Sequence, residues 1–113
     1  MNTLKTITSL ALALLVAAVL ASCVKKNPLT GDQRIFAGKW VAADGTFIVI
    51  YNDGGGDLKT SNSSITGGKT TFTDDTITIG LGPITKKMKI TAKPKEAGGN
   101  WVMVLDGFEY KKE

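Results

Sequence analysis

"TDDTITIGLGP", residues 73–83, is the stretch of the chain that decides the fold class. Ile77, Ile79 and Leu81 alternate with Thr and Gly residues, so the apolar side chains fall on one face of an extended backbone and the small polar ones on the other. This period of two residues predicts a β-strand with one buried face. Pro83 ends the strand, because a proline has no N–H to donate to a neighbouring strand.

The same alternation returns on both sides of this stretch. Downstream, "ITKKMKITAKP" (84–94) places apolar residues on one face and mainly lysines on the other. Further out, Asp44-Gly45 and Asp106-Gly107 each join two short β-rich runs, and Asp-Gly is among the dipeptides that best form hairpin turns. Further turns are expected at residues 52–56, at Gly67-Gly68, where two weaker strands meet, and at residues 94–99.

The pattern as a whole predicts an all-β fold for residues 35–113. No sustained period of 3.6 residues occurs there, and about seven or eight short strands with turns every 8 to 12 residues are typical of an antiparallel meander. We expect the meander to close into a mini-barrel or a two-layer sandwich, because long open sheet edges promote aggregation. The expected core consists of Trp40, Phe47, Val49, Ile77, Ile79, Met88, Ile90, Trp101, Met103 and Phe108.

The first 22 residues have a different character. Met1–Thr8 carries one positive charge, Lys5, and no acid, and every residue in Leu10–Ala21 is Leu, Ala or Val. This apolar run is too short to span a bilayer, which requires about 20 residues in a helix. It also lacks the polar face that a core helix would show. A basic start, a short apolar run and small residues at its end indicate an export signal.

The only cysteine of the chain follows this leader at once. Leu20-Ala21-Ser22-Cys23 resembles the lipobox of bacterial lipoprotein precursors. The resemblance implies cleavage between Ser22 and Cys23, a diacylglyceryl thioether on Cys23 and an acyl chain, such as palmitate, on the new amino group. Several acyl chains give durable membrane anchoring. The expected organisation is therefore a removed signal peptide (1–22), a lipidated tether (23–34) and the β domain, with no cofactor besides the lipid on Cys23.

The residues after Cys23 bear on location. In lipoproteins of bacteria with two membranes, an Asp after the lipidated cysteine favours retention in the inner membrane, and this chain has Val24 there. The resemblance thus implies a lipid-anchored protein of the cell envelope, on the periplasmic leaflet of the outer membrane. Lys25 and Lys26 lie where they would add attraction to anionic headgroups.

The residue types present argue against catalysis. The chain has no histidine, and lipidation would consume its only thiol, so general-base triads and thiol nucleophiles are excluded and we expect no enzyme. The adjacent acids Asp74 and Asp75 are typical of a turn. The Gly-rich loop 52–57 carries three oxygen ligands but lacks the calcium-loop pattern, so no metal site is expected. A net charge of only +4 makes nucleic acid a poor partner for an exported chain.

One further motif opens the β domain. Gly38-Lys39-Trp40 resembles the Gly-x-Trp with which lipocalins begin their first barrel strand. In that family the tryptophan closes the bottom of the barrel, and the cavity above it holds a small apolar ligand. The resemblance makes Trp40 a candidate ligand contact, and Trp101 is the second tryptophan that can contact a ligand or a partner.

Two functions remain open at this point. The first is a non-enzymatic, lipid-anchored module that binds another envelope protein, as an accessory factor or an inhibitor. The alternative is a small lipocalin-like carrier of an apolar ligand. We expect the first, because a barrel of about 80 residues is filled by its own side chains.

Overall fold

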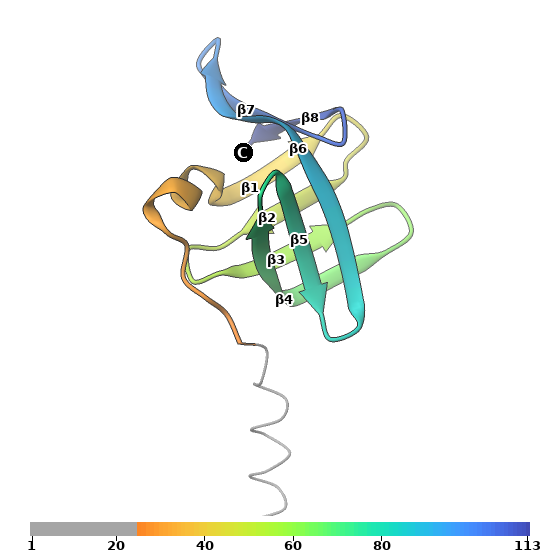
Figure 1. The fold of residues 1–113 in the computed structure, drawn as a ribbon. Helices are drawn as coiled ribbons and strands as arrows, with labels where there is room; N and C mark the ends of the chain where they lie inside the picture. Colours follow the sequence, from red (N-terminus) through yellow and green to blue (C-terminus); the bar gives the residue numbers. More distant parts are fainter. Residues whose placement is uncertain (1–24) are drawn as a thin grey trace, which may run out of the picture.

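The computed structural model describes residues 25–113, and the proposed signal peptide, Ser22 and Cys23 lie outside this range. One short 3-10 helix, η1 (Gly31–Phe36), precedes eight strands (Figure 1). The strands are β1 (Gly38–Ala42), β2 (Phe47–Ile50), β3 (Gly55–Lys59), β4 (Ser64–Thr73), β5 (Thr76–Leu81), β6 (Ile84–Ala97), β7 (Asn100–Leu105) and β8 (Phe108–Lys112). No helix among the described residues is long and apolar enough to cross a membrane.

The eight strands form a closed barrel in simple sequence order. Every strand pairs antiparallel with the strand before and after it in the chain, and β1 pairs with β8 to close the sheet. At this seam Trp40, Val41 and Ala42 pair with Lys112, Lys111 and Tyr110. The predicted all-β mini-barrel is therefore confirmed. Because every strand finds both neighbours within residues 38–112, the barrel is complete without residues 1–24, and the shortened chain 24–113 contains the whole folding unit.

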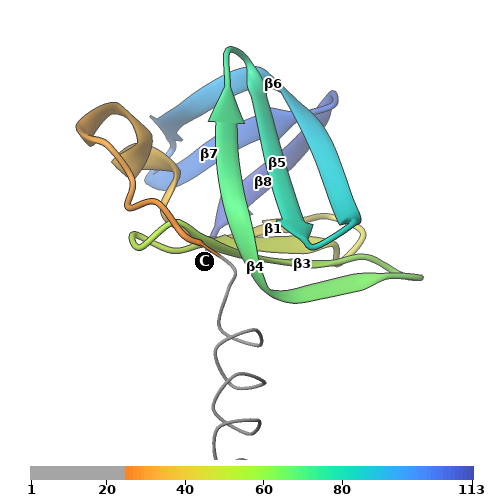
Figure 2. The same ribbon diagram turned by 60° about the horizontal axis from the view of Figure 1, so that its bottom comes forward.

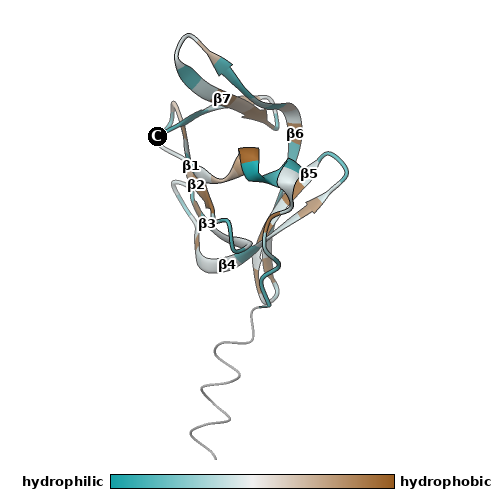
Figure 3. Ribbon diagram, turned by 90° about the vertical axis from the view of Figure 1, so that its left-hand side faces the viewer, coloured by the Kyte–Doolittle hydropathy of each residue, from teal (hydrophilic) through white to brown (hydrophobic). Residues whose placement is uncertain are grey.

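The helix η1 closes one end of the barrel, where it lies across the centre of the strand ring (Figure 3). A capping box at Thr30 and Gln33 starts the helix, and its last residue, Phe36, is buried. The Phe36 ring packs against Phe72, with 5.1 Å between the ring centroids. Leu29 is also buried, and its N–H donates to the carbonyl of Asn52. The packed unit thus begins at Leu29, so the last residues of the expected tether contact the barrel.

The core follows the sequence prediction at some positions and departs from it at others. Five of the ten expected core residues are buried, and Ile90 packs against them from a half-buried position. The buried five are Trp40, Ile77, Ile79, Met88 and Met103. Buried residues that were not expected are Leu29, Phe36, Ile48, Ile50, Leu58, Ile65, Leu105 and Tyr110. The predictions for Phe47, Val49, Trp101 and Phe108 are wrong: the first two are half-buried, and the last two are exposed.

The error at β2 has a definite cause in the first hairpin. A two-residue Asp44-Gly45 turn would pair Trp40 with Val49, but the observed pairing is Trp40 with Ile48. The loop therefore has three residues, with Gly45 at a positive φ of 87°. A shift of one residue moves every side chain of a strand to the opposite face. Because all four residues of β2 are apolar, alternation alone does not reveal which pair points inward.

Two expected turns are irregularities inside strands. Gly67-Gly68 lies within β4, where the register against β3 shifts, and the chain reverses instead at residues 60–63. β6 continues through Pro94 to Ala97, and its register against β7 shifts on either side of Ala92. A β-bulge tolerates a glycine or a proline that regular pairing would not. These bulges bend long strands so that the sheet can close.

The Trp40 indole provides a first test of this core. Trp40→Phe removes the hydrogen bond of 2.8 Å that the indole Nε1–H donates to the Phe36 carbonyl and leaves that carbonyl without this partner. We expect the free energy of unfolding to fall by about 1–3 kcal/mol, measured by urea denaturation of residues 24–113 followed by far-ultraviolet circular dichroism. Trp101→Phe is the matched control, because Trp101 is 39% exposed and the change should cost less than about 0.5 kcal/mol. Equal losses in both variants would contradict the assigned role of Trp40.

Candidate functional site

The two ends of the barrel differ. The end that η1 covers also carries the β2–β3, β4–β5 and β6–β7 turns, and the opposite end carries the β1–β2, β3–β4, β5–β6 and β7–β8 turns. The β3–β4 hairpin projects at this second end, away from η1, in both ribbon views (Figures 1 and 2). No helix covers the second end in the described part of the chain.

A cavity of about 780 Å³ opens at this uncovered end and extends along β8 as far as Asn100 and Glu113. This volume is within the range of about 300–1,000 Å³ that is typical of small-molecule sites. Its apolar wall consists of Leu58, Met88, Leu105, Phe108 and Tyr110. The barrel interior is therefore filled by side chains near η1 and hollow near the opposite end, which differs from the fully filled interior that we expected.

Apolar side chains also form the rim of the cavity end. Phe108 is 65% exposed, Ile84 is 61% exposed and Leu81 is 36% exposed. The two-residue turn Asp106-Gly107 pairs Phe108 with the buried Leu105, so both side chains lie on the inward face. Phe108 stays exposed because it sits at the last rung of the barrel, where nothing packs above it. The rim thus presents an exposed aromatic ring beside the hollow interior.

Tyr110 lies deeper in the same wall and is only 7% exposed. Its hydroxyl makes no hydrogen bond to another of residues 25–113. Every buried polar side-chain atom among these residues has a partner, so the Tyr110 hydroxyl must be accessible, and it faces the cavity that Tyr110 lines. Burial raises the pKa of Tyr110, and the negative charges of Asp44 and Asp106 raise it further. The phenol is therefore neutral at ordinary pH and available for hydrogen bonding.

The two acids belong to neighbouring turns at the cavity mouth. In the β1–β2 turn, Asp44 Oδ1 accepts a hydrogen bond of 2.9 Å from the N–H of Thr46, and hydrogen bonds from Thr46 lower the pKa of Asp44. In the β7–β8 turn, Asp106 Oδ1 accepts one of 2.9 Å from the N–H of Lys89. Both carboxylates line the cavity and are fixed in place by backbone donors. They give this part of the mouth a rigid negative charge.

Lys86 is a basic residue on the inward side of the mouth. It lies two residues before the buried Met88 and pairs with Ile79, so it belongs to the inward face of β6. The other basic side chains near the cavity have different surroundings. Lys112 pairs with Trp40 and shares its inward face, with Nζ 5.6 Å from the centroid of the Trp40 ring. Lys111 alternates with Tyr110 on β8 and therefore faces outward.

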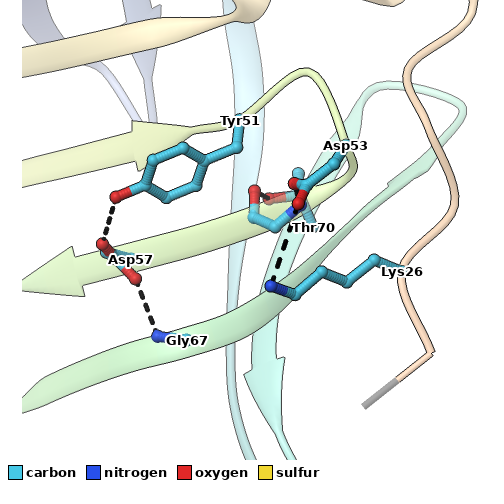
Figure 4. A network of polar contacts seen from close by, with 7 residues as sticks. Lys26, Tyr51, Asp53, Asp57, Gly67 and Thr70 are labelled. Carbon is cyan, nitrogen blue, oxygen red and sulfur yellow. Dashed lines mark hydrogen bonds and ion pairs between the residues drawn. The ribbon is translucent and has the colours of Figure 1, made fainter. Parts of the chain in front are cut away.

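A separate polar network holds the β2–β3–β4 corner together (Figure 4). The Tyr51 hydroxyl donates a bond of 2.6 Å to Asp57 Oδ2, and Asp57 Oδ1 accepts one of 2.8 Å from the N–H of Gly67. The bond to Asp57 raises the pKa of Tyr51. The buried Thr70 hydroxyl donates to the Gly55 carbonyl.

The same network accounts for the acids of the Gly-rich loop. Asp53 Oδ1 accepts a bond of 2.8 Å from the N–H of Gly55, and Lys26 Nζ lies 4.0 Å from Asp53 Oδ2. Among residues 25–113 no three His, Cys, Asp or Glu side chains come close enough to hold a metal ion. The carboxylates of this loop instead accept hydrogen bonds from the turn and from β4.

The two tryptophans that the sequence analysis named as candidate contacts differ in exposure. Trp40 is fully buried, and its ring is covered by Lys112, so its surface is not available to a protein partner. Trp101 is exposed near the tip of the β6–β7 hairpin, which extends beyond the barrel (Figure 1). The proposed lipidation site Cys23 lies outside the described residues.

Sequence reasoning missed the cavity residues Leu58, Lys86 and Tyr110. A usable signal did exist for one of them. The Asp106-Gly107 hairpin read as a two-residue turn pairs Met103 with Tyr110, which would have placed Tyr110 on the inward face. No comparable signal identifies Leu58, because the register of β3 depends on the bulge against β4.

Comparison with known proteins adds nothing to this geometry. No protein-family model, no curated protein and no solved structure matches the chain.

The two tyrosines, Tyr51 and Tyr110, are the only ones in the chain and can be titrated separately. We expect each phenol to ionise above its ordinary value of 10.0, measured from phenolate absorbance in Tyr51→Phe and Tyr110→Phe, which isolate one tyrosine each. Asp44→Asn should lower the pKa of Tyr110 and leave that of Tyr51 unchanged.

The sign of the shift fixes its effect on stability. A folded-state pKa above the unfolded value favours folding below pH 10, and this contribution is lost as the pH rises through the folded-state pKa. A Tyr110 phenol that titrates like free tyrosine would contradict its burial in the cavity wall.

Proposed function

We propose that this protein is a non-enzymatic, lipid-anchored barrel of the bacterial cell envelope that binds a small, partly apolar molecule in the cavity at its uncovered end. The observation that carries the proposal is the cavity itself, with about 780 Å³ of space against five apolar or aromatic side chains. Burial of apolar ligand surface there would supply binding energy of about 25 cal/mol per Å² before the costs of association.

The closed end of the barrel bears on where a ligand would enter. η1, Phe36 and the fully buried Trp40 fill that end, so the opposite end, where the cavity opens, is the entrance that we propose. A barrel closed at one end resembles the arrangement that the lipocalin-like Gly38-x-Trp40 motif implies.

The lipid anchor is proposed from the lipobox. Leu20-Ala21-Ser22-Cys23 follows a short apolar leader, and Cys23 lies only six positions before the packed Leu29. Six extended residues reach at most about 20 Å. An acylated Cys23 would therefore keep the barrel close to its membrane, and the absence of Asp after Cys23 favours the periplasmic leaflet of the outer membrane.

A second function, binding of another envelope protein, is favoured by a different feature. Trp101 is 39% exposed on a hairpin that projects beyond the barrel. Tryptophan is enriched among the residues that contribute most to protein–protein binding. Trp101 is not among the residues that line the cavity, so the two functions can be tested independently.

Native mass spectrometry tests ligand binding directly. Residues 24–113, expressed in a bacterial periplasm, should carry a reproducible extra mass that is lost on denaturation. Thr46→Trp places a large ring at the inward-facing rim of the cavity and should abolish the extra mass. Thr71→Trp is the matched control, because Thr71 is exposed on β4 away from the cavity, and it should retain the ligand.

A bare protein mass in every preparation, together with no binding of added amphiphiles, would overturn the proposal. The interaction function would then be tested by crosslinking the full lipidated chain in its own envelope, with Trp101→Ala as the variant expected to lose the partner.

A further inference from the structure

Two acidic turn residues lie near Tyr110 at the cavity mouth, and the lysines that also line the cavity belong to β6 and β8. Ala42 is the register partner of Tyr110 across the β1–β8 seam, and Asp44 follows Ala42 by two residues in the β1–β2 turn. Asp106 occupies the adjacent β7–β8 turn. Two carboxylates, a buried phenol with an unpartnered hydroxyl and the exposed Phe108 ring therefore meet at one stretch of the rim.

We propose, on the basis of the ligand-binding function above, that the ligand is a cationic amphiphile whose ammonium group lies at this stretch of the rim and whose apolar body fills the cavity. The ammonium N–H groups donate to the Tyr110 oxygen and to the carboxylates of Asp44 and Asp106. Aromatic ring faces also attract cations, so Phe108 adds a favourable contact at the entrance.

The positions of the other charges support a cation over an anion. Lys39 pairs with Glu113 on the outer surface, with 3.3 Å between Nζ and Oε1, and Lys112 lies over Trp40. Lys86 and Lys112 also line the cavity, but Asp44 and Asp106 are the charged groups that raise the pKa of Tyr110. The two carboxylates in the adjacent turns favour a positive ligand group beside the hydroxyl.

The geometry also explains why these acids are suited to bind a head group. Each carboxylate is already fixed by a backbone N–H, from Thr46 for Asp44 and from Lys89 for Asp106, so little conformational entropy is lost when a ligand arrives. Both backbone bonds are made to Oδ1 of the carboxylate. The apolar wall below them gives a short alkyl or aryl body a place to bind out of water.

Three probes with the same eight-carbon chain separate the effect of the head group from that of the chain: octylammonium, octanol and octanoate. Binding to residues 24–113 at pH 7 is measured from amide chemical shifts. We expect octylammonium to bind about five to ten times more tightly than octanol, the gain expected from two partly exposed charge contacts, and octanoate to bind most weakly.

The double variant Asp44→Asn/Asp106→Asn keeps the amide oxygens that accept the backbone hydrogen bonds and removes both charges. It should reduce the affinity for octylammonium to that for octanol and leave octanol binding unchanged, which also shows that the cavity is intact. Asp74→Asn is the matched control. Asp74 is exposed in the turn at the other end, and its positive φ of 50° is also accessible to Asn. The Asp74→Asn variant should prefer octylammonium over octanol as strongly as the unchanged chain does.

Each other result has a distinct meaning. Equal affinities for the three probes, or tighter binding of octanoate through Lys86, would overturn the cationic ligand and leave ligand binding in place. A preference for octylammonium that persists in the double variant would also overturn it. Failure of all three probes to bind would overturn the proposed function together with this inference.

Discussion

The hydrogen bond from the Trp40 indole to the Phe36 carbonyl is the contact on which the rest of the structure depends. It joins β1 to the last residue of η1 at 2.8 Å within a buried environment. A buried carbonyl without a partner would cost about 1–3 kcal/mol. The bond thus holds η1 across one end of the barrel, and this closed end is where the largest fully buried side chain of the described chain sits.

The barrel becomes asymmetric as a consequence. Trp40, Phe36 and Phe72 fill the end near η1, whereas at the opposite end Leu58, Met88, Leu105, Phe108 and Tyr110 surround a cavity. An eight-stranded barrel is just wide enough for side chains to fill or for one small ligand. Large residues gathered at one end therefore leave space at the other. The buried side chains form one core cluster that stabilises this small domain.

The sequence predicted the architecture better than the site, for a physical reason that particular strands illustrate. In β5, apolar and polar residues alternate, so both the strand and its buried face were predicted correctly at Ile77 and Ile79. In β2 all four residues are apolar, so the face is set by a loop of three residues that the Asp-Gly dipeptide does not reveal. The same limit applies to β6, where a bulge carries the strand through Pro94.

The site could not be predicted from alternation. Alternation shows which face of a strand is buried, but not how close a residue lies to an end of the barrel. Phe108 and Leu105 share a face and a register pair, and one is 65% exposed while the other is 1% exposed. The difference comes only from depth in the barrel, and depth depends on strand stagger and on where η1 lies. Tyr110, Asp44 and Asp106 come together through the β1–β8 seam, the contact between the two ends of the strand order. This seam pairs residues about 65 positions apart, so no local sequence pattern predicts it.

The attachment point of the N-terminal segment gives the barrel a direction. Lys26 lies 4.0 Å from Asp53, and Leu29 donates its N–H to Asn52, so residues 26–29 run along the β2–β3 turn at the end that η1 closes. Gly54 allows this close approach, because a side chain there would collide with the backbone of Asn27. In the proposed lipoprotein the short tether would therefore connect the closed end of the barrel to the membrane. The cavity mouth then points away from the anchoring membrane, toward the side from which a ligand or a second surface would approach.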